Sequence, residues 1–170
     1  MIKLFMGGSR DLLYYESRKS YLGIYHNGKI VFKGNANIAP HSSIYVSNSV
    51  LSFGKCFKSN NGCKFSCVEG IFIGNYCLLG GGVSIRDSDG HRVGCYNEIG
   101  KKIEHKNKDR IIIGNHVWIA NKVDILKGVK IPDDCIIAYR SLLIDEFEQS
   151  STLIGGIPAR CIKNKMWWKI

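Results

Sequence analysis

Residues 113–143 read IGNHVWIANKVDILKGVKIPDDCIIAYRSLL, and this stretch decides the fold. An aliphatic residue recurs at every sixth position, and a small or β-branched residue stands four positions after each of the first five. A period of six matches neither the 3.6 residues of an α-helical turn nor the two-residue repeat of a flat strand. It is typical of a parallel β-helix, in which each six-residue unit forms one face of a triangular coil. The aliphatic series is Ile113, Ile119, Ile125, Ile131, Ile137 and Leu143, and the second series is Val117, Val123, Val129, Cys135 and Ser141.

The repeat predicts which side chains are buried. The aliphatic residue of each unit points into the prism, and the small residue beside it lets the chain turn the corner. Three units make a coil of about 18 residues, and successive coils stack at about 4.8 Å, the spacing of neighbouring strands. Only stacked aliphatic side chains fit inside such a prism, so we expect the functional groups on its outer surface.

Earlier parts of the chain follow the same period with two interruptions. One series runs through Phe32, Ile38, Ile44, Val50 and Cys56, and another runs through Cys67, Ile73, Leu79 and Ile85. Between them, Ser59–Gly62 has the composition of a turn. After Ile85 the repeat is absent until Ile111, and the segment at about 86–111 is polar and charged. A loop this long in a compact domain is typically functional, so we predict a functional excursion here.

The repeat covers most of the chain and indicates a single all-β domain. We predict an N-terminal cap segment at residues 1–29, a parallel β-helix at 30–146 and a short basic C-terminal tail at 147–170. Within the cap, Asp11–Tyr21 is compatible with a short helix or with an irregular segment. No apolar run is long enough for a membrane span, and the N-terminus lacks the apolar stretch of a signal peptide.

The cysteines indicate the redox environment. There are seven, an odd number with no pairing pattern, and Cys56, Cys67 and Cys135 fall on positions predicted to point inward. Buried thiols in place of aliphatic residues favour a reducing compartment, so we expect a cytoplasmic protein. Cys63 and Cys67 have C-x3-C spacing without a second pair, so a zinc site is not expected, nor any other metal.

The chain has a formal net charge of +10 and a pI near 9.3. Such a balance indicates either a solvated basic surface or a partner that is anionic: a polyanionic substrate, a phosphate-bearing cofactor or a nucleic acid. Nucleic acid has the least support, because no recognition module is visible and the aromatic residues are not interleaved with Lys and Arg.

Three short motifs carry a family resemblance: SIRDSDGH at 84–91, HVWIA at 116–120 and GIPAR at 156–160. With the repeat, they resemble the hexapeptide-repeat acetyltransferases over roughly residues 30–165. Within that family they are similar to the branch that O-acetylates capsular and lipopolysaccharide sugars, including the polysialic acid O-acetyltransferases. The resemblance implies a left-handed β-helix, a homotrimer with active sites between subunits, and transfer of acetyl from acetyl-CoA to a hydroxyl of a bacterial surface glycan.

His91 is the predicted general base. It matches the family's catalytic histidine, lies in the excursion and is preceded by Asp87 and Asp89. Because acetyl-CoA is already an activated thioester, transfer needs only one group that accepts the proton of the attacking hydroxyl near pH 7, and imidazole suits this role. A carboxylate on Nδ1 would fix its tautomer. Asp89 belongs to the candidate catalytic residues, and the choice between it and Asp87 stays open. The alternative for His91 is a solvent-exposed loop histidine.

Trp118 is the second candidate catalytic residue. Its position in the repeat predicts that it faces outward, and an exposed indole indicates a ligand or a packing partner. In the resembled family this tryptophan lies by the thioester end of the coenzyme, where its N–H can bind the sulfur or carbonyl region. The alternative is an aromatic residue packed against a neighbouring subunit. We interpret His116 in the same motif as a surface residue rather than a second base.

The predicted coenzyme contacts follow the C-terminal coils. Small residues at Ala120 and Ala138 allow the pantetheine chain to approach the backbone. Arg160 and Lys163 match the family's basic positions, and Arg140 is a candidate substitute for a missing cation. The chain departs from the common pattern at three places: Ala138–Ser141 in place of Gly-Ala-Gly-Ser, Asp145 in place of Lys, and Ile157 in place of Asn.

Other functions make different demands on the same residues. A γ-type carbonic anhydrase would need three converging histidines, and His91, His105 and His116 lack its spacing. A non-catalytic β-helix scaffold and a covalent route through Cys95 are further alternatives. The acceptor also stays open: the basic charge favours an anionic glycan, while sugar nucleotides, amino sugars and antibiotics remain alternatives.

Overall fold

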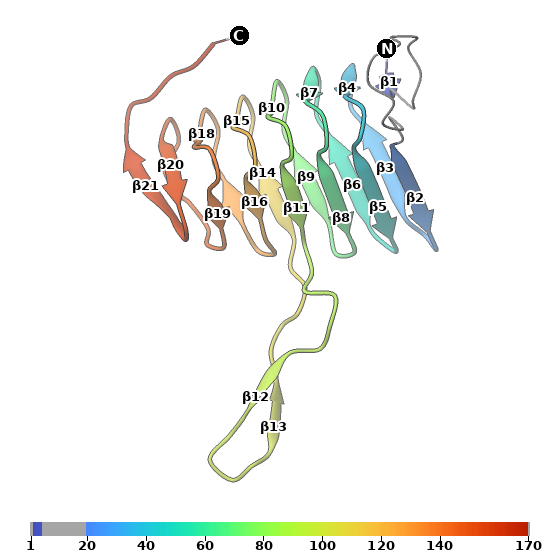
Figure 1. Cartoon of the computed structure of the whole chain (residues 1–170), viewed down its shortest axis with the longest axis vertical. Helices are drawn as coiled ribbons and strands as arrows, with labels where there is room; N and C mark the ends of the chain where they lie inside the picture. Colours follow the sequence, from blue (N-terminus) through green and yellow to red (C-terminus); the bar gives the residue numbers. More distant parts are fainter. Residues whose placement is uncertain (1, 5–19, 170) are drawn as a thin grey trace, which may run out of the picture.

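The computed structural model describes residues 2–4 and 20–169, and within them the chain winds into a β-helix whose three walls are parallel sheets (Figure 1). Face A contains β1 (Ile2–Leu4), β4 (Ala36–Ile38), β7 (Phe57–Ser59), β10 (Leu78–Leu79), β15 (Trp118–Ile119), β18 (Ile136–Ile137), β20 (Leu153–Gly156) and the antiparallel β21 (Ala159–Lys163). Face B contains β2 (Tyr21–Tyr25), β5 (Ser43–Ser47), β8 (Lys64–Cys67), β11 (Ser84–Arg86), β16 (Asp124–Ile125) and β19 (Leu142–Leu143). Face C contains β3 (Lys29–Phe32), β6 (Val50–Phe53), β9 (Ile71–Ile73), β14 (Ile111–Ile113) and β17 (Lys130–Ile131). The parallel β-helix predicted from the repeat is confirmed, and it matches the left-handed β-helix that the family resemblance implies.

The inward series of the C-terminal coils is confirmed. All six aliphatic residues from Ile113 to Leu143 are at most 2 % exposed, and so are the five small residues from Val117 to Ser141. The prediction that the small residues form the corners needs correction. The residue just before each small one takes the left-handed backbone conformation that turns the chain, as at His116 (φ 51°) and Asp134 (φ 61°).

The coils are not all the same length. Trp118 pairs with Ile136, which gives 18 residues per coil, whereas Lys58 pairs with Leu78, which gives 20. The longer coils place three inward residues on face B, as at Cys63, Phe65 and Cys67, where the later coils have two. A longer coil encloses more space. The expectation of a purely aliphatic interior is therefore wrong for the N-terminal half, where Phe53, Phe57 and Phe65 pack with ring centroids 4.6–6.4 Å apart.

The longer face also explains a wrong prediction for one cysteine. Cys56 is exposed and has a φ of 56°, so it forms a corner rather than pointing inward. The six-residue count that placed it inside slips out of phase after Ile44, and the buried residues are Leu51, Phe53 and Phe57. Cys67 and Cys135 are buried as predicted.

The β-helix extends beyond the predicted range of 30–146. At one end β2 and β3 already pair with β5 and β6, and at the other β20 pairs in parallel with β18. The sequence does not reveal the outermost strand, because β2 at the end of the stack buries only Gly23 and so carries no inward aliphatic residue. The prediction for Asp11–Tyr21 falls almost wholly on residues outside those described. Within residues 2–4 and 20–169 no helix is long and apolar enough to cross a membrane.

The excursion forms a β-hairpin that projects from the β-helix (Figure 1). The chain leaves face B after β11 and enters face C at β14, and between them β12 (Gly94–Tyr96) pairs antiparallel with β13 (Lys102–Glu104). We call residues 87–110 the hairpin arm. It leaves from the corner between faces B and C, which lies opposite face A in a triangular prism.

The thiols are expected to react in two groups. Burial raises the pKa of Cys63 and Cys77 to about 11 and that of Cys67 to about 12, so these buried thiols stay protonated and unreactive in the folded protein. Cys56, Cys95 and Cys161 are exposed. Brief alkylation of the native protein followed by peptide mass spectrometry should label the exposed group alone. Rapid labelling of Cys67 in the native state would contradict the fold.

Candidate active site

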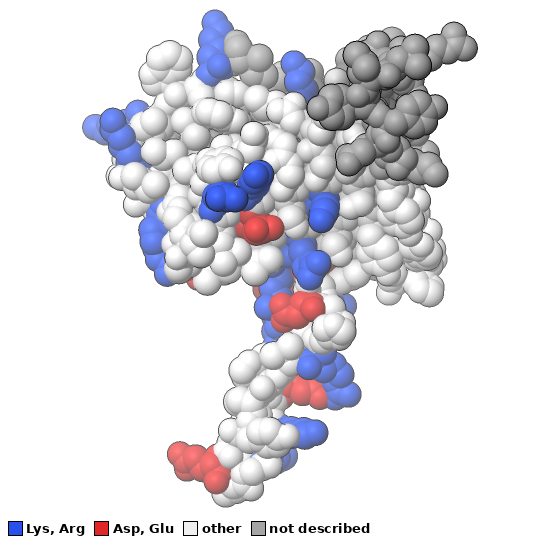
Figure 2. Space-filling model, in the orientation of Figure 1, with Lys and Arg blue, Asp and Glu red and all other residues white. Residues whose placement is uncertain are grey.

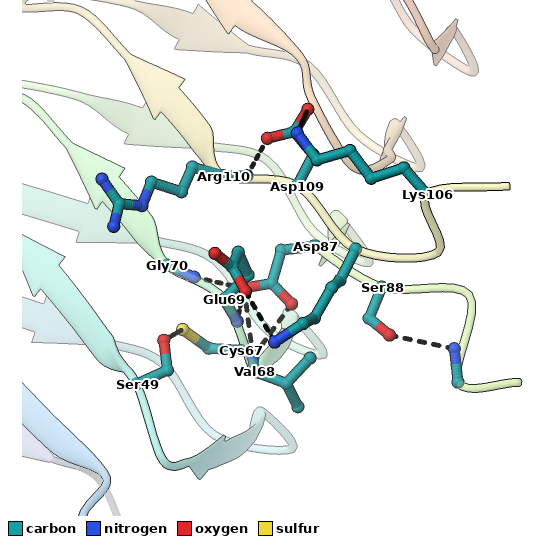
Figure 3. A network of polar contacts seen from close by, with 12 residues as sticks. Ser49, Cys67, Val68, Glu69, Gly70, Asp87, Ser88, Lys106, Asp109 and Arg110 are labelled. Atoms are coloured by element: carbon teal, nitrogen blue, oxygen red, sulfur yellow. Dashed lines mark hydrogen bonds and ion pairs between the residues drawn. The ribbon is translucent and has the colours of Figure 1, made fainter. Parts of the chain in front are cut away.

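A buried carboxylate holds the root of the hairpin arm. Asp87 follows β11 at the inward position that Cys67 occupies one coil earlier, and it is fully buried. Its oxygens accept hydrogen bonds from the backbone N–H groups of Val68 (2.9 and 3.0 Å), Glu69 (2.8 Å) and Gly70 (2.7 Å), as Figure 3 shows. These bonds compensate the cost of burying the charge and fix the place where the chain leaves the β-helix.

Further contacts tie the two strands of the arm to the β-helix. Lys108 forms an ion pair with Glu69 at 2.8 Å, near the Asp87 carboxylate. On the other strand, Asp89 forms an ion pair with Lys127 at 2.7 Å, and both side chains are about one-third exposed. Pairs this exposed contribute little to stability singly, but together they orient the base of the arm.

His91 lies beyond these anchors, with an exposed side chain on the arm. Its backbone carbonyl accepts a hydrogen bond from Asn107 Nδ2 at 3.1 Å, which links the two strands of the arm. Within the described part of the chain, no hydrogen bond joins the His91 ring to Asp87 or Asp89. The Asp87 carboxylate is directed at the backbone of residues 68–70, and Asp89 is directed at Lys127. The arrangement therefore gives both carboxylates structural partners in the single chain.

Trp118 lies on β15 with its side chain outward on face A, and it is 37 % exposed. Its ring centroid lies 6.2 Å from that of Trp168, in the C-terminal tail. His116 stacks on the other indole at 4.2 Å and 9°, and its Nδ1 lies 2.8 Å from Asp134 Oδ1. His116 is thus a packed, half-buried residue and not simply a surface one. The sequence alone gave no indication of a role for Trp168.

A column of small residues begins two positions beyond Trp118. Ala120 N–H donates to the Ile137 carbonyl at 2.9 Å, and Ala138 N–H donates to Ile154 at 2.8 Å, so the two alanines stack in successive coils. Gly155 continues the column, because a Cβ there would lie 2.8 Å from the Ala138 Cβ. An extended ligand can therefore reach the backbone of this edge without meeting a long side chain. That the pantetheine arm of coenzyme A lies along these residues stays a prediction from the sequence.

The predicted phosphate contacts lie at the C-terminal end of this column. Arg160 pairs with Gly155 across β20 and β21, but its guanidinium binds Asp145 at 2.5 Å. Lys163 is exposed on β21, and Arg140 lies over the Tyr139 ring at 5.6 Å. Among the residues described, neither Arg140 nor Lys163 forms an ion pair with a carboxylate. Figure 2 shows basic side chains along this side of the β-helix, near β21 of Figure 1.

One chain does not bring its two candidate catalytic residues together. His91 lies on the arm, which leaves from the corner between faces B and C, whereas Trp118 lies on face A. In Figure 1 the arm extends from the edge of the β-helix opposite to β15. A reaction that uses both residues therefore needs the arm of a second copy.

Comparison with known proteins finds similar sequences among acetyltransferases. The sequence is 40 % identical over 99 residues to the polysialic acid O-acetyltransferase of Neisseria meningitidis, a match that covers 58 % of this chain and 44 % of the relative. Over this stretch the chain is homologous to a polysialic acid O-acetyltransferase. It is also 29 % identical over 112 residues to a chloramphenicol acetyltransferase of Morganella morganii, covering 58 % of this chain and 53 % of that protein. No family model matches the sequence.

A solved structure resembles this protein over more of the chain than these two sequence relatives do. The polysialic acid O-acetyltransferase OatWY superimposes with a TM-score of 0.56 at 26 % identity, covering 89 % of this chain and 71 % of that one. The chain spans about half the length of the curated sequence relatives it matches. The fold is therefore established, and the activity of the whole protein is a separate proposal.

Proposed function

We propose that this protein transfers the acetyl group of acetyl-CoA directly to a hydroxyl of a bacterial surface glycan. The acceptor is a capsule sugar, a sialic acid polymer or a lipopolysaccharide sugar. The observation that carries the proposal is the division of chemistry over the fold: an exposed imidazole on a projecting arm, and an exposed indole beside a column of small residues on face A. The names of the sequence relatives support acetyl transfer and, for two of them, a polysialic acid acceptor.

The reaction needs one proton acceptor. His91 Nε2 takes the proton of the sugar hydroxyl as its oxygen attacks the thioester carbonyl, and a tetrahedral intermediate forms. When the carbon–sulfur bond breaks, His91 returns the proton to the departing thiolate, so free coenzyme A thiol and an acetyl ester are the products. The Trp118 indole N–H donates a hydrogen bond to the thioester region and so stabilises the charge that develops there.

We propose a homotrimer in which the arm of one subunit reaches face A of its neighbour. Closed rings are the usual result when one surface of a chain binds a different surface of the next copy. The arm and face A are two such surfaces, and each carries half of the candidate site. The free cysteines and the use of acetyl-CoA suit a cytoplasmic location.

The coenzyme follows the column formed by Ala120, Ala138 and Gly155, with its thioester at Trp118. Its phosphates then lie near Arg140 and Lys163. Arg160 forms an ion pair with Asp145, so it can bind a phosphate only if it breaks that pair or contacts both groups at once. Acetyl-CoA brings the activated acyl group, and the side chains of this protein supply binding, orientation and proton transfer.

Trp118 is expected to act through both its ring and its N–H. Trp118→Phe, which keeps an aromatic ring, should lower kcat/KM for acetyl-CoA by about five- to tenfold, the value of one hydrogen bond. Trp118→Ala should lower it further, because packing is lost as well. Steady-state thiol release measures both. Trp167→Ala is the matched control, since Trp167 is 81 % exposed and should leave kcat/KM unchanged.

Thiol release from acetyl-CoA tests the function itself. Purified protein should release thiol with anionic glycans, and acetyl esters should appear on the glycan by mass spectrometry. A rate that falls as salt rises would support an anionic acceptor. The chloramphenicol acetyltransferase relative favours a small acceptor as the second candidate, so sugar nucleotides and antibiotics belong in the same panel. Absence of thiol release with every acceptor of the panel would favour a non-catalytic scaffold.

A further inference from the structure

The C-terminal tail returns along the corner between faces C and A. That corner is a column of left-handed residues in successive coils: His116, Asp134 and Ser151. Met166 N–H donates to the Ser151 carbonyl at 2.8 Å, and Trp168 Nε1 donates to the His116 carbonyl at 2.9 Å. Within three residues the tail therefore runs two coils back towards the middle of the β-helix.

Trp168 is the residue by which the tail is held there. It is 9 % exposed, whereas its neighbour Trp167 is 81 % exposed. Its indole makes a hydrogen bond to the backbone of His116 and stacks on the His116 ring at 4.2 Å. The ring of His116 is in turn held by Asp134 at 2.8 Å. An indole with a satisfied N–H and a stacked face occupies a defined position.

This position lies directly beside Trp118. The two indole centroids are 6.2 Å apart and inclined at 44°, within the range of an attractive aromatic pair. Trp168 is anchored at residue 116, which precedes Trp118 along the strand, while the column of Ala120 and Ala138 follows it. Trp118 thus has an aromatic neighbour on one side and the open edge for an extended ligand on the other.

We propose that Trp168 is a positioning residue that braces the Trp118 indole from the side away from the coenzyme. This inference rests on the proposed function, because it gives Trp118 the thioester. Without the brace, Trp118 can turn towards the space that Trp168 leaves, and its N–H no longer points steadily at the thioester. Holding a reacting group in place in advance is a general source of rate enhancement.

The contact itself is testable without substrate. In a protein with Trp167→Phe and Trp168→Phe, Trp118 is the single remaining tryptophan, and its fluorescence reports its surroundings. The matched protein carries Trp167→Phe and Trp168→Ala. Acrylamide should quench Trp118 more strongly in the alanine protein, because the ring that shields it is gone. Equal quenching in the two proteins would overturn the brace, whatever their activity.

The consequence for transfer is tested by a double-mutant cycle. Trp168→Ala should lower kcat/KM for acetyl-CoA by about two- to tenfold, the value of an aromatic pair, and Trp168→Phe should restore most of it. In the Trp118→Ala background the same change should have little further effect. An equal loss in both backgrounds would overturn positioning through Trp118. If the unmodified protein shows no transfer with any acceptor, the proposed function fails, and the quenching comparison still decides whether Trp168 braces Trp118.

Discussion

Replacement of His91 by alanine is expected to lower kcat for acetyl transfer by about 10²- to 10⁴-fold, the usual contribution of a general base. The side chain is exposed on the hairpin arm and makes no contact that the fold depends on, so the free energy of unfolding should not change. Rates of thiol release with saturating acetyl-CoA and acceptor measure the first effect. Urea unfolding measures the second.

His105→Ala is the matched control for that experiment. The side chain of His105 is also exposed on the arm, and its backbone N–H donates a hydrogen bond to the Val93 carbonyl at 2.8 Å. Its replacement should leave the rate close to that of the unmodified protein. Full activity of His91→Ala, or an equal loss in both variants, would show that His91 is not the base.

Asp87→Asn is expected to destabilise the protein by about 2–4 kcal/mol, although the side chain barely changes in size. Both carboxylate oxygens accept backbone hydrogen bonds from residues 68–70, so an amide NH₂ would point a donor at other donors. Because Asp87 fixes the root of the arm, the activity should fall as well. Urea unfolding and thiol release measure the two effects.

Asp89→Asn separates this role from a general effect of charge. Asp89 lies two residues further along the arm and pairs with Lys127 in a partly exposed ion pair. Its loss should cost at most about 1 kcal/mol. A similar loss of stability in the Asp87 and Asp89 variants would contradict the assignment of Asp87 as the buried anchor.

The fold was predictable where the repeat is strict. From Ile113 to Leu143 each coil has 18 residues, and every predicted inward position is buried. The N-terminal coils are longer by two to four residues, which a fixed count of six cannot detect. The wrong prediction for Cys56 follows from that. The left-handed corners are occupied by residues as different as Tyr76, His116 and Asp134, so residue type does not predict where a corner lies.

The site was predictable as a set of residues and not as an arrangement. The motifs identify His91 and Trp118 as candidates, but spacing cannot reveal that they lie on opposite sides of one chain. That fact follows only from which faces the arm joins. The burial of Asp87 was not predicted, because the repeat is defined by apolar inward residues and an aspartate at such a position indicates that the repeat has ended. Trp168 was missed because a tail without a repeat carries no register.

Subunit mixing tests most directly whether His91 of one copy acts with Trp118 of another. His91→Ala and Trp118→Ala proteins, whose residual activities are first measured separately and subtracted, are unfolded and refolded together, with different affinity tags to verify that they co-assemble. With random mixing in equal amounts, about a quarter of the sites combine an intact His91 with an intact Trp118 from the neighbour. The account predicts that activity returns to about that fraction of the unmodified level. Verified co-assembly without any recovery of activity would contradict it.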